Sequence, residues 1–132
     1  MIVAGAVMSD SKKRVLVVDD DNEILDSLEM ALGSRGYDVV LAHDGNEGLA
    51  RVERDAPDLV ILDIVMPRRN GFNVLKCLNL MSTLNPRVIM VSGNEDPRHR
   101  AFAESSGVDA FVSKPFDVDY VLDLVDQLLT VE

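Results

Sequence analysis

Short apolar segments alternate with longer amphipathic segments along the chain from residue 14 onward. Five segments are short and almost continuously apolar, which is typical of parallel strands that are covered on both faces. They span residues 15–18, 39–42, 59–62, 88–91 and 110–112. Between them, apolar residues recur with the 3.6-residue period of a helix that buries one face. These stretches lie around residues 24–32, 49–52, 74–78, 101–103 and 118–129. Turn-forming residues mark the ends of these helices. Gly36 stands where the first helix is expected to end, Pro57 follows the second helix, and Pro97 stands at the start of the fourth.

Five strands that alternate with five helices indicate βαβ units, whose right-handed crossovers give a parallel sheet with helices on both faces. We therefore predict an α/β fold of the doubly wound (βα)5, flavodoxin-like type, with strand order 2-1-3-4-5. In such sheets, ligands bind beyond the carboxyl ends of the strands, at the switch point between the first and third strands. Residues that carry chemistry are expected directly after the apolar segments.

Length and charge restrict the class of protein further. The 132 residues suit one domain, and 47% apolar with 27% charged residues is a globular composition. The net charge of −10 argues against nucleic acid or an anionic membrane as the main partner. No apolar run is long enough for a membrane span, and the single cysteine, Cys77, excludes an internal disulfide, so we expect a cytoplasmic protein.

Residues 1–11 are predicted to be a disordered N-terminal extension, and residues 12–132 the folded domain. The extension begins with an apolar run, but its positive charges follow that run, whereas in a secretory signal they precede it.

Polar side chains follow four of the five predicted strands. Asp19, Asp20 and Asp21 come after the first strand, Asp63 after the third, Ser92 after the fourth and Lys114 just after the fifth. Asp21 stands beside the expected start of the first helix, so a helix cap and a ligand are equally good interpretations of this residue.

Clustered carboxylates repel one another unless a cation offsets their charge, and Mg²⁺ (or Mn²⁺) is a hard ion that prefers such oxygens. A lysine and a hydroxyl beside that ion suit phosphoryl transfer, in which positioning and charge neutralisation dominate. A carboxylate can itself be the nucleophile. His43 and His99 are predicted to be solvent-exposed, so neither is expected to act as a base.

These residues stand in motifs that resemble the receiver domain of two-component response regulators, the CheY-like proteins, over residues 13–129. The motifs are VLVVDDD at 15–21, DIVMP at 63–67 with Gly71 eight residues after Asp63, VSG at 91–93 and FVSKPF at 111–116. Each motif alone is weak, but all occur in the family's order and at predicted strand ends.

The resemblance implies a role for each matching residue in a phosphorelay. Asp63 is the phosphoacceptor. Asp20, Asp63 and the backbone carbonyl of Val65 ligate Mg²⁺, and Asp19 acts through a bound water. Ser92 and Lys114 would bind the phosphoryl group. Phe111 would be the switch aromatic, although ordinary core packing remains an alternative for this residue. The Lys114–Pro115 peptide bond would be cis, although Pro115 could instead be an ordinary proline at a helix start.

The expected partners are also those of the family. A sensor histidine kinase or a histidine phosphotransfer protein supplies the phosphoryl group, and the face of the fourth helix, fifth strand and fifth helix contacts an unidentified target or forms a weak dimer. The protein is expected to be a signalling receiver, not an enzyme, apart from its own phosphorylation and dephosphorylation. Because no output domain follows the last predicted helix, we expect output through protein contact.

Three alternatives were weighed against this interpretation. A haloacid dehalogenase-type phosphatase would match the D-x-D spacing of Asp19 and Asp21, but Glu23 replaces the expected Thr or Val. A flavodoxin-like FMN binder would place phosphate where three carboxylates repel it. A degenerate receiver that acts only as an interaction module is disfavoured by intact Asp63, Ser92 and Lys114.

Overall fold

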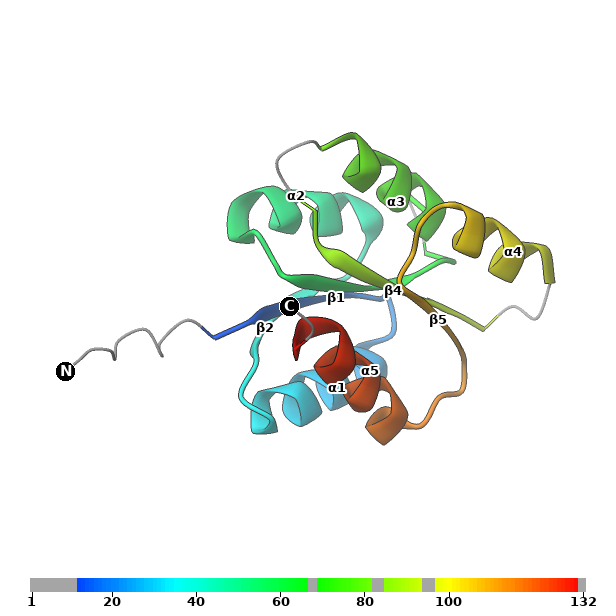
Figure 1. The fold of residues 1–132 in the computed structure, drawn as a ribbon. Helices are drawn as coiled ribbons and strands as arrows, with labels where there is room; N and C mark the ends of the chain where they lie inside the picture. The colour runs from blue at the N-terminus through cyan, green and yellow to red at the C-terminus, as the bar shows by residue number, and fades with distance from the viewer. Residues whose placement is uncertain (1–11, 67–68, 82–84, 94–96, 131–132) are drawn as a thin grey trace.

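The structure is a computed structural model that describes residues 12–66, 69–81, 85–93 and 97–130. Strands and helices alternate strictly along these residues (Figure 1). In chain order the elements are β1 (Arg14–Val18), α1 (Asn22–Ser34), β2 (Asp38–Ala42), α2 (Gly45–Asp55), β3 (Leu59–Asp63), α3 (Gly71–Leu80), β4 (Arg87–Ser92), α4 (Pro97–Ser105), β5 (Ala110–Ser113) and α5 (Val118–Thr130). The predicted extension, residues 1–11, lies outside the described residues.

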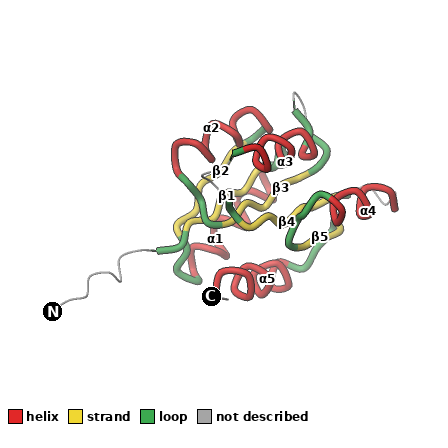
Figure 2. Tube along the Cα trace, turned by 45° about the horizontal axis from the view of Figure 1, so that its top comes forward, coloured by secondary structure: helices red, strands yellow, loops and turns green. Residues whose placement is uncertain are grey.

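The five strands form one parallel sheet in the order β2-β1-β3-β4-β5 (Figure 2). Val17 of β1 is paired with Leu41 of β2 on one side and with Ile61 of β3 on the other. The predicted strand order is confirmed. It makes β1 and β3 neighbours, so the residues that follow these two strands leave the sheet side by side.

Helices cover both faces of the sheet, with α2, α3 and α4 on one side and α1 and α5 on the other (Figure 1). Alternate residues of β1 face opposite sides: Leu16 and Val18 join the core against α2 and α3, whereas Val15 and Val17 join the core against α1 and α5. Burial on both faces explains why the central strands are continuously apolar.

Local sequence signals set the helix boundaries. The carboxylate of Asp21 accepts a hydrogen bond from the main-chain N–H of Glu23 and caps α1. Gly36 follows α1 with a φ of +92°, a conformation that favours glycine. Pro57 lies two residues after the end of α2, and Pro97 is the first residue of α4. The expectations for these three residues are confirmed.

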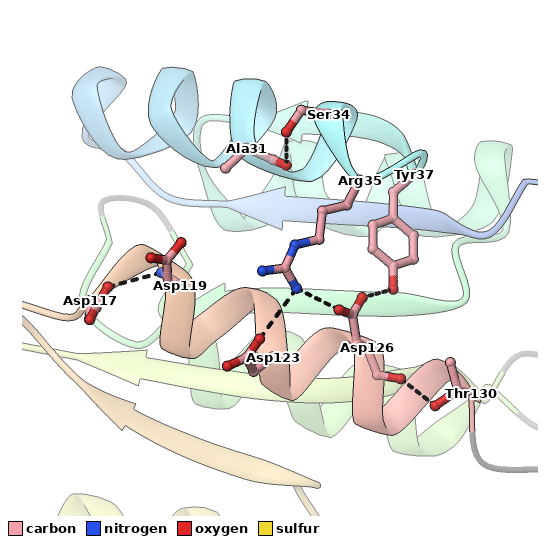
Figure 3. A network of polar contacts seen from close by, with 9 residues as sticks. All are labelled: Ala31, Ser34, Arg35, Tyr37, Asp117, Asp119, Asp123, Asp126 and Thr130. Atoms are coloured by element: carbon pink, nitrogen blue, oxygen red, sulfur yellow. Dashed lines mark hydrogen bonds and ion pairs between the residues drawn. The ribbon is translucent and has the colours of Figure 1, made fainter.

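Polar contacts join the end of α1 to α5 (Figure 3). The Arg35 guanidinium lies 2.5 Å from Asp126 Oδ2 and 3.3 Å from Asp123 Oδ1. The Tyr37 hydroxyl donates to Asp126, and burial together with this hydrogen bond raises the pKa of Tyr37 to about 12. These contacts hold α5 close to α1.

The fourth helix departs from the sequence prediction. Of its apolar residues only Ala103 is buried, and Phe102 is 54% exposed. His99, predicted to be exposed, is half-buried and packs edge-on against Phe72 at 5.6 Å between ring centroids. The prediction for His99 was wrong because α4 packs against α3, where the ring of Phe72 contacts both His99 and Phe102. Exposure of His43 is confirmed.

Candidate functional site

The polar residues predicted at the strand ends do meet at one edge of the sheet. Asp63 and Ser92 are the last residues of β3 and β4, and Asp19 and Lys114 directly follow β1 and β5. Asp19, Asp63 and Ser92 are the buried polar residues of the described chain, with 3%, 4% and 1% of their surface exposed. Burying polar or charged groups is unfavourable unless a partner compensates for the lost contact with water. The clustering of three such groups therefore marks this edge of the sheet as a candidate functional site.

Lys114 provides the compensating charge. Its Nζ lies 3.0 Å from Asp19 Oδ2 and 3.3 Å from Asp63 Oδ2. Its main-chain N–H donates to the carbonyl of Ser92 at 2.8 Å, which continues the β4–β5 pairing to the site. The Lys114–Pro115 peptide bond is cis, as the family resemblance implied.

Three carboxylates can share one ion at this edge. Oxygen atoms of Asp19, Asp20 and Asp63 all lie within 4.8 Å of one another. Asp20 is exposed, while Asp19 is oriented by the main-chain N–H of Asp21, which donates to its Oδ1 at 2.9 Å. Hard oxygen donors at this spacing fit Mg²⁺ or Mn²⁺. The Asp21 side chain caps α1, so the cap interpretation of that residue holds in this structure.

The same crowding changes the electrostatics of Asp63. Its pKa is raised from 3.8 to about 6, because burial disfavours its charged form and because Asp19 and, more weakly, Asp20 repel it; Lys114 opposes this rise. For Lys114, burial alone would lower the pKa, but the contacts with Asp19 and Asp63 outweigh burial and raise it. The site is therefore short of positive charge, which a divalent cation would supply.

The loop after β3 is held close to Asp63. The main-chain N–H of Gly71 donates to the Ile64 carbonyl at 2.7 Å, and a Cβ on Gly71 would lie 2.3 Å from the Asp63 carbonyl oxygen. Only glycine allows α3 to begin this near the phosphoacceptor candidate. Val65, next along the loop, is 59% exposed and lines an open pocket of about 680 Å³ with Asp20, Asp63 and Lys114.

Comparison with known proteins gives the family. The model of the response regulator receiver domain matches residues 15–126. The chain belongs to this family. Its members are signalling proteins of two-component systems, and this membership favours the receiver interpretation over the phosphatase and FMN-binding alternatives.

Relatives and solved structures agree with this assignment. Response regulator MprA of Mycobacterium avium is 38% identical over 117 residues, which cover 88% of this chain and 50% of that protein. The alkaline phosphatase synthesis transcriptional regulatory protein PhoP of Bacillus subtilis is 35% identical over 104 residues, which cover 79% of this chain and 43% of that protein. The chain thus spans about half the length of the curated relatives that it matches.

The fold of the receiver domain is also found in solved structures. A CheY-like response regulator receiver domain protein from Methanospirillum hungatei superimposes with a TM-score of 0.83 at 35% identity, over 91% of this chain and 95% of that chain. The receiver domain of the Francisella response regulator 1452 gives a TM-score of 0.84 at 29% identity, over 90% of this chain and 98% of that chain.

Two features of this receiver domain were not predicted from its sequence. The Arg100 guanidinium lies over the ring of Phe111, 4.6 Å from its centroid, in a cation–π arrangement. Arg69, in the loop before α3, bonds to Asn46 of α2. No local pattern announces either contact, because the partners come from separate elements.

The longest described helices, α1 and α5, have 13 residues each, and none in the described part of the chain is long and apolar enough to cross a bilayer.

Proposed function

We propose that this receiver domain accepts a phosphoryl group on Asp63 from a phosphohistidine of a sensor histidine kinase or histidine phosphotransfer protein. The observation that carries the proposal is a buried carboxylate that faces an open pocket and is 3.3 Å from a lysine ammonium. A buried carboxylate with one cationic partner suits a nucleophile that must become esterified without losing its surroundings.

The divalent cation would be held by Asp20, Asp63 and the backbone carbonyl of Val65, with Asp19 acting through a bound water. The clustering of carboxylate oxygens within 4.8 Å supports this assignment. When bound, Mg²⁺ or Mn²⁺ neutralises the carboxylates and the charge on the phosphoryl oxygens.

The chain's own residues account for the transfer. An Asp63 oxygen forms the new P–O bond while the P–N bond to the donor histidine breaks, and the electron pair of that bond returns to the imidazole. Lys114 balances negative charge on the phosphoryl oxygens, and the Ser92 hydroxyl donates to one of them. Because Lys114 engages Asp63 Oδ2, we assign Oδ1 as the attacking oxygen.

Phosphorylation then changes the contacts of the domain. The phosphoryl group adds about 1.5 to 2 negative charges. Lys114 and Ser92 bind this group and move toward it together with their loops. Phe111 lies on β5, three residues before Lys114, and biases the surface formed by α4, β5 and α5 toward one arrangement. That surface binds the downstream protein target or a second copy of the domain; nucleic acid and membrane are not proposed partners.

Labelling by a small acyl-phosphate donor in Mg²⁺ tests the proposal. Wild-type protein and the Asp26→Asn variant, altered at an exposed carboxylate of α1, are expected to incorporate acid-stable label. The Asp63→Asn variant is expected to incorporate none. Equal acid-stable labelling of Asp63→Asn would show that another residue accepts the phosphoryl group.

A further inference from the structure

Arg69 connects three elements around the candidate site. It precedes Asn70, the residue that caps α3. Its Nε donates to Asn46 Oδ1 of α2 at 2.8 Å, and another guanidinium N–H donates to Cys77 Sγ of α3 at 3.7 Å. One side chain thus ties the residues directly before α3 to both neighbouring helices.

The backbone of Arg69 is equally constrained. A Cβ on Gly45, the first residue of α2, would lie 2.3 Å from the Arg69 carbonyl oxygen and 2.8 Å from its Cβ. The start of α2 therefore rests directly on the loop, and the absence of a side chain at Gly45 makes that contact possible.

Described contacts connect the segment of Arg69 to the carboxylate edge. Asn70 Oδ1 accepts from the main-chain N–H of Asn73 at 3.0 Å, which fixes the first turn of α3. Gly71 follows, and its N–H holds the Ile64 carbonyl at 2.7 Å. Ile64 stands between Asp63 and Val65, two of the proposed cation ligands.

We propose that Arg69 is a positioning residue for the divalent cation: by bracing the loop on Asn46 and Cys77 it sets the place of the Val65 carbonyl relative to Asp63. This inference rests on the proposed function. Mg²⁺ demands near-ideal octahedral geometry at about 2.0–2.1 Å, so a loop displaced by a few tenths of an ångström loses a ligand of good geometry. Residues that orient ligands commonly affect affinity without touching the metal.

The sign of the effect separates positioning from simple charge. Arg69 carries a positive charge, so a purely electrostatic role predicts that its removal strengthens Mg²⁺ binding. A positioning role predicts weaker binding in Arg69→Met, and nearly the same loss in Arg69→Lys, which keeps the charge but not the planar fork that reaches two partners.

The experiment measures the Mg²⁺ dissociation constant by calorimetric titration of wild type, Arg69→Met, Arg69→Lys and Asn46→Ala. Arg51→Met is the matched control, because Arg51 lies on α2 and is 3.6 Å from Asp55, outside the brace. We expect about three- to tenfold weaker binding in the two Arg69 variants, a smaller loss in Asn46→Ala and no change in the control. In the metal-free protein, hydrogen exchange at the Gly71 amide should be faster in the two Arg69 variants and in Asn46→Ala than in wild type.

Unchanged or tighter Mg²⁺ binding in both Arg69 variants would overturn the positioning role. A lower melting temperature with unchanged Mg²⁺ affinity would also overturn it, since Arg69 would then be merely structural. Failure of the wild type to bind Mg²⁺ would instead refute the proposed cation site itself, and the inference with it.

Discussion

Replacing Asp63 with asparagine should stabilise the metal-free domain while it removes the proposed phosphoacceptor. In the folded protein, burial and the carboxylates of Asp19 and Asp20 raise the pKa of Asp63 from 3.8 to about 6. The folded state thus holds this proton more tightly than the unfolded state does, and it tolerates the ionised form less well. Asparagine keeps the size of the side chain and has no charge to repel.

The magnitude follows from the size of the pKa shift. A shift of about two pKa units at 1.36 kcal/mol each sets an upper limit of about 3 kcal/mol on the gain in stability. Access of water through the open pocket weakens the effect, so we expect a gain between about 1 kcal/mol and this limit. The stabilising contribution of protonated Asp63 is complete below pH 3.8 and is lost as the pH rises through about 6. The advantage of Asp63→Asn should therefore be absent near pH 4 and complete above about pH 7.

Urea unfolding in EDTA measures this difference directly. Wild type, Asp63→Asn and the exposed control Asp26→Asn would be compared at about pH 7.5 and at about pH 4. Only Asp63→Asn should gain stability, and only at the higher pH. The reasoning would be refuted if Asp63→Asn were no more stable than wild type at neutral pH, or if its gain in stability were the same at both pH values.

Addition of Mg²⁺ extends the same experiment. A ligand that binds the folded state stabilises it by RT ln(1 + [L]/Kd). Mg²⁺ should therefore stabilise wild type more than Asp63→Asn and reduce the difference in their free energies of unfolding. If Mg²⁺ left this difference unchanged, that result would count against Asp63 as a ligand of the cation.

Three further substitutions test other parts of the site. Gly71→Ala should lower the free energy of unfolding in urea by about 3 kcal/mol or more, because the new Cβ would lie 2.3 Å from the Asp63 carbonyl oxygen. Gly33→Ala is the control, because Gly33 lies on α1 with open space around it, and it should raise the free energy of unfolding by about 0.5 to 1 kcal/mol. Equal effects of the two substitutions would contradict the close-packing argument. Lys114→Met should lower the stability of the metal-free domain by about 1 to 3 kcal/mol and reduce acyl-phosphate labelling, since Asp19 and Asp63 lose their cationic partner; undiminished stability in EDTA would argue that the lysine compensates little. The Val65 side chain lines the pocket of Asp63 and offers no hydrogen bond to a water that would hydrolyse phosphorylated Asp63. We therefore expect slow loss of label from wild type and faster loss from Val65→Asn, and a wild-type label lost within seconds would contradict this expectation.

The layout of the domain was predictable because it depends on local patterns. Buried parallel strands must be apolar on both faces, so the five short segments were visible in the sequence, and alternation with helices then restricts the topology. Asp63, Ser92 and Lys114 could be assigned to one edge of the sheet for the same reason, since the carboxyl ends of parallel strands meet there.

Only the tertiary structure decided how these groups interact. The placement of the Lys114 ammonium between Asp19 and Asp63, and the raised pKa of Asp63, depend on burial and on distances between separate strands. The half-buried His99 and the contact of Arg69 with Asn46, 23 residues away, depend on how helices pack against one another. Periodicity records which face of an element is buried, but not which side chain of another element meets it, because that is set by the packing of the whole chain.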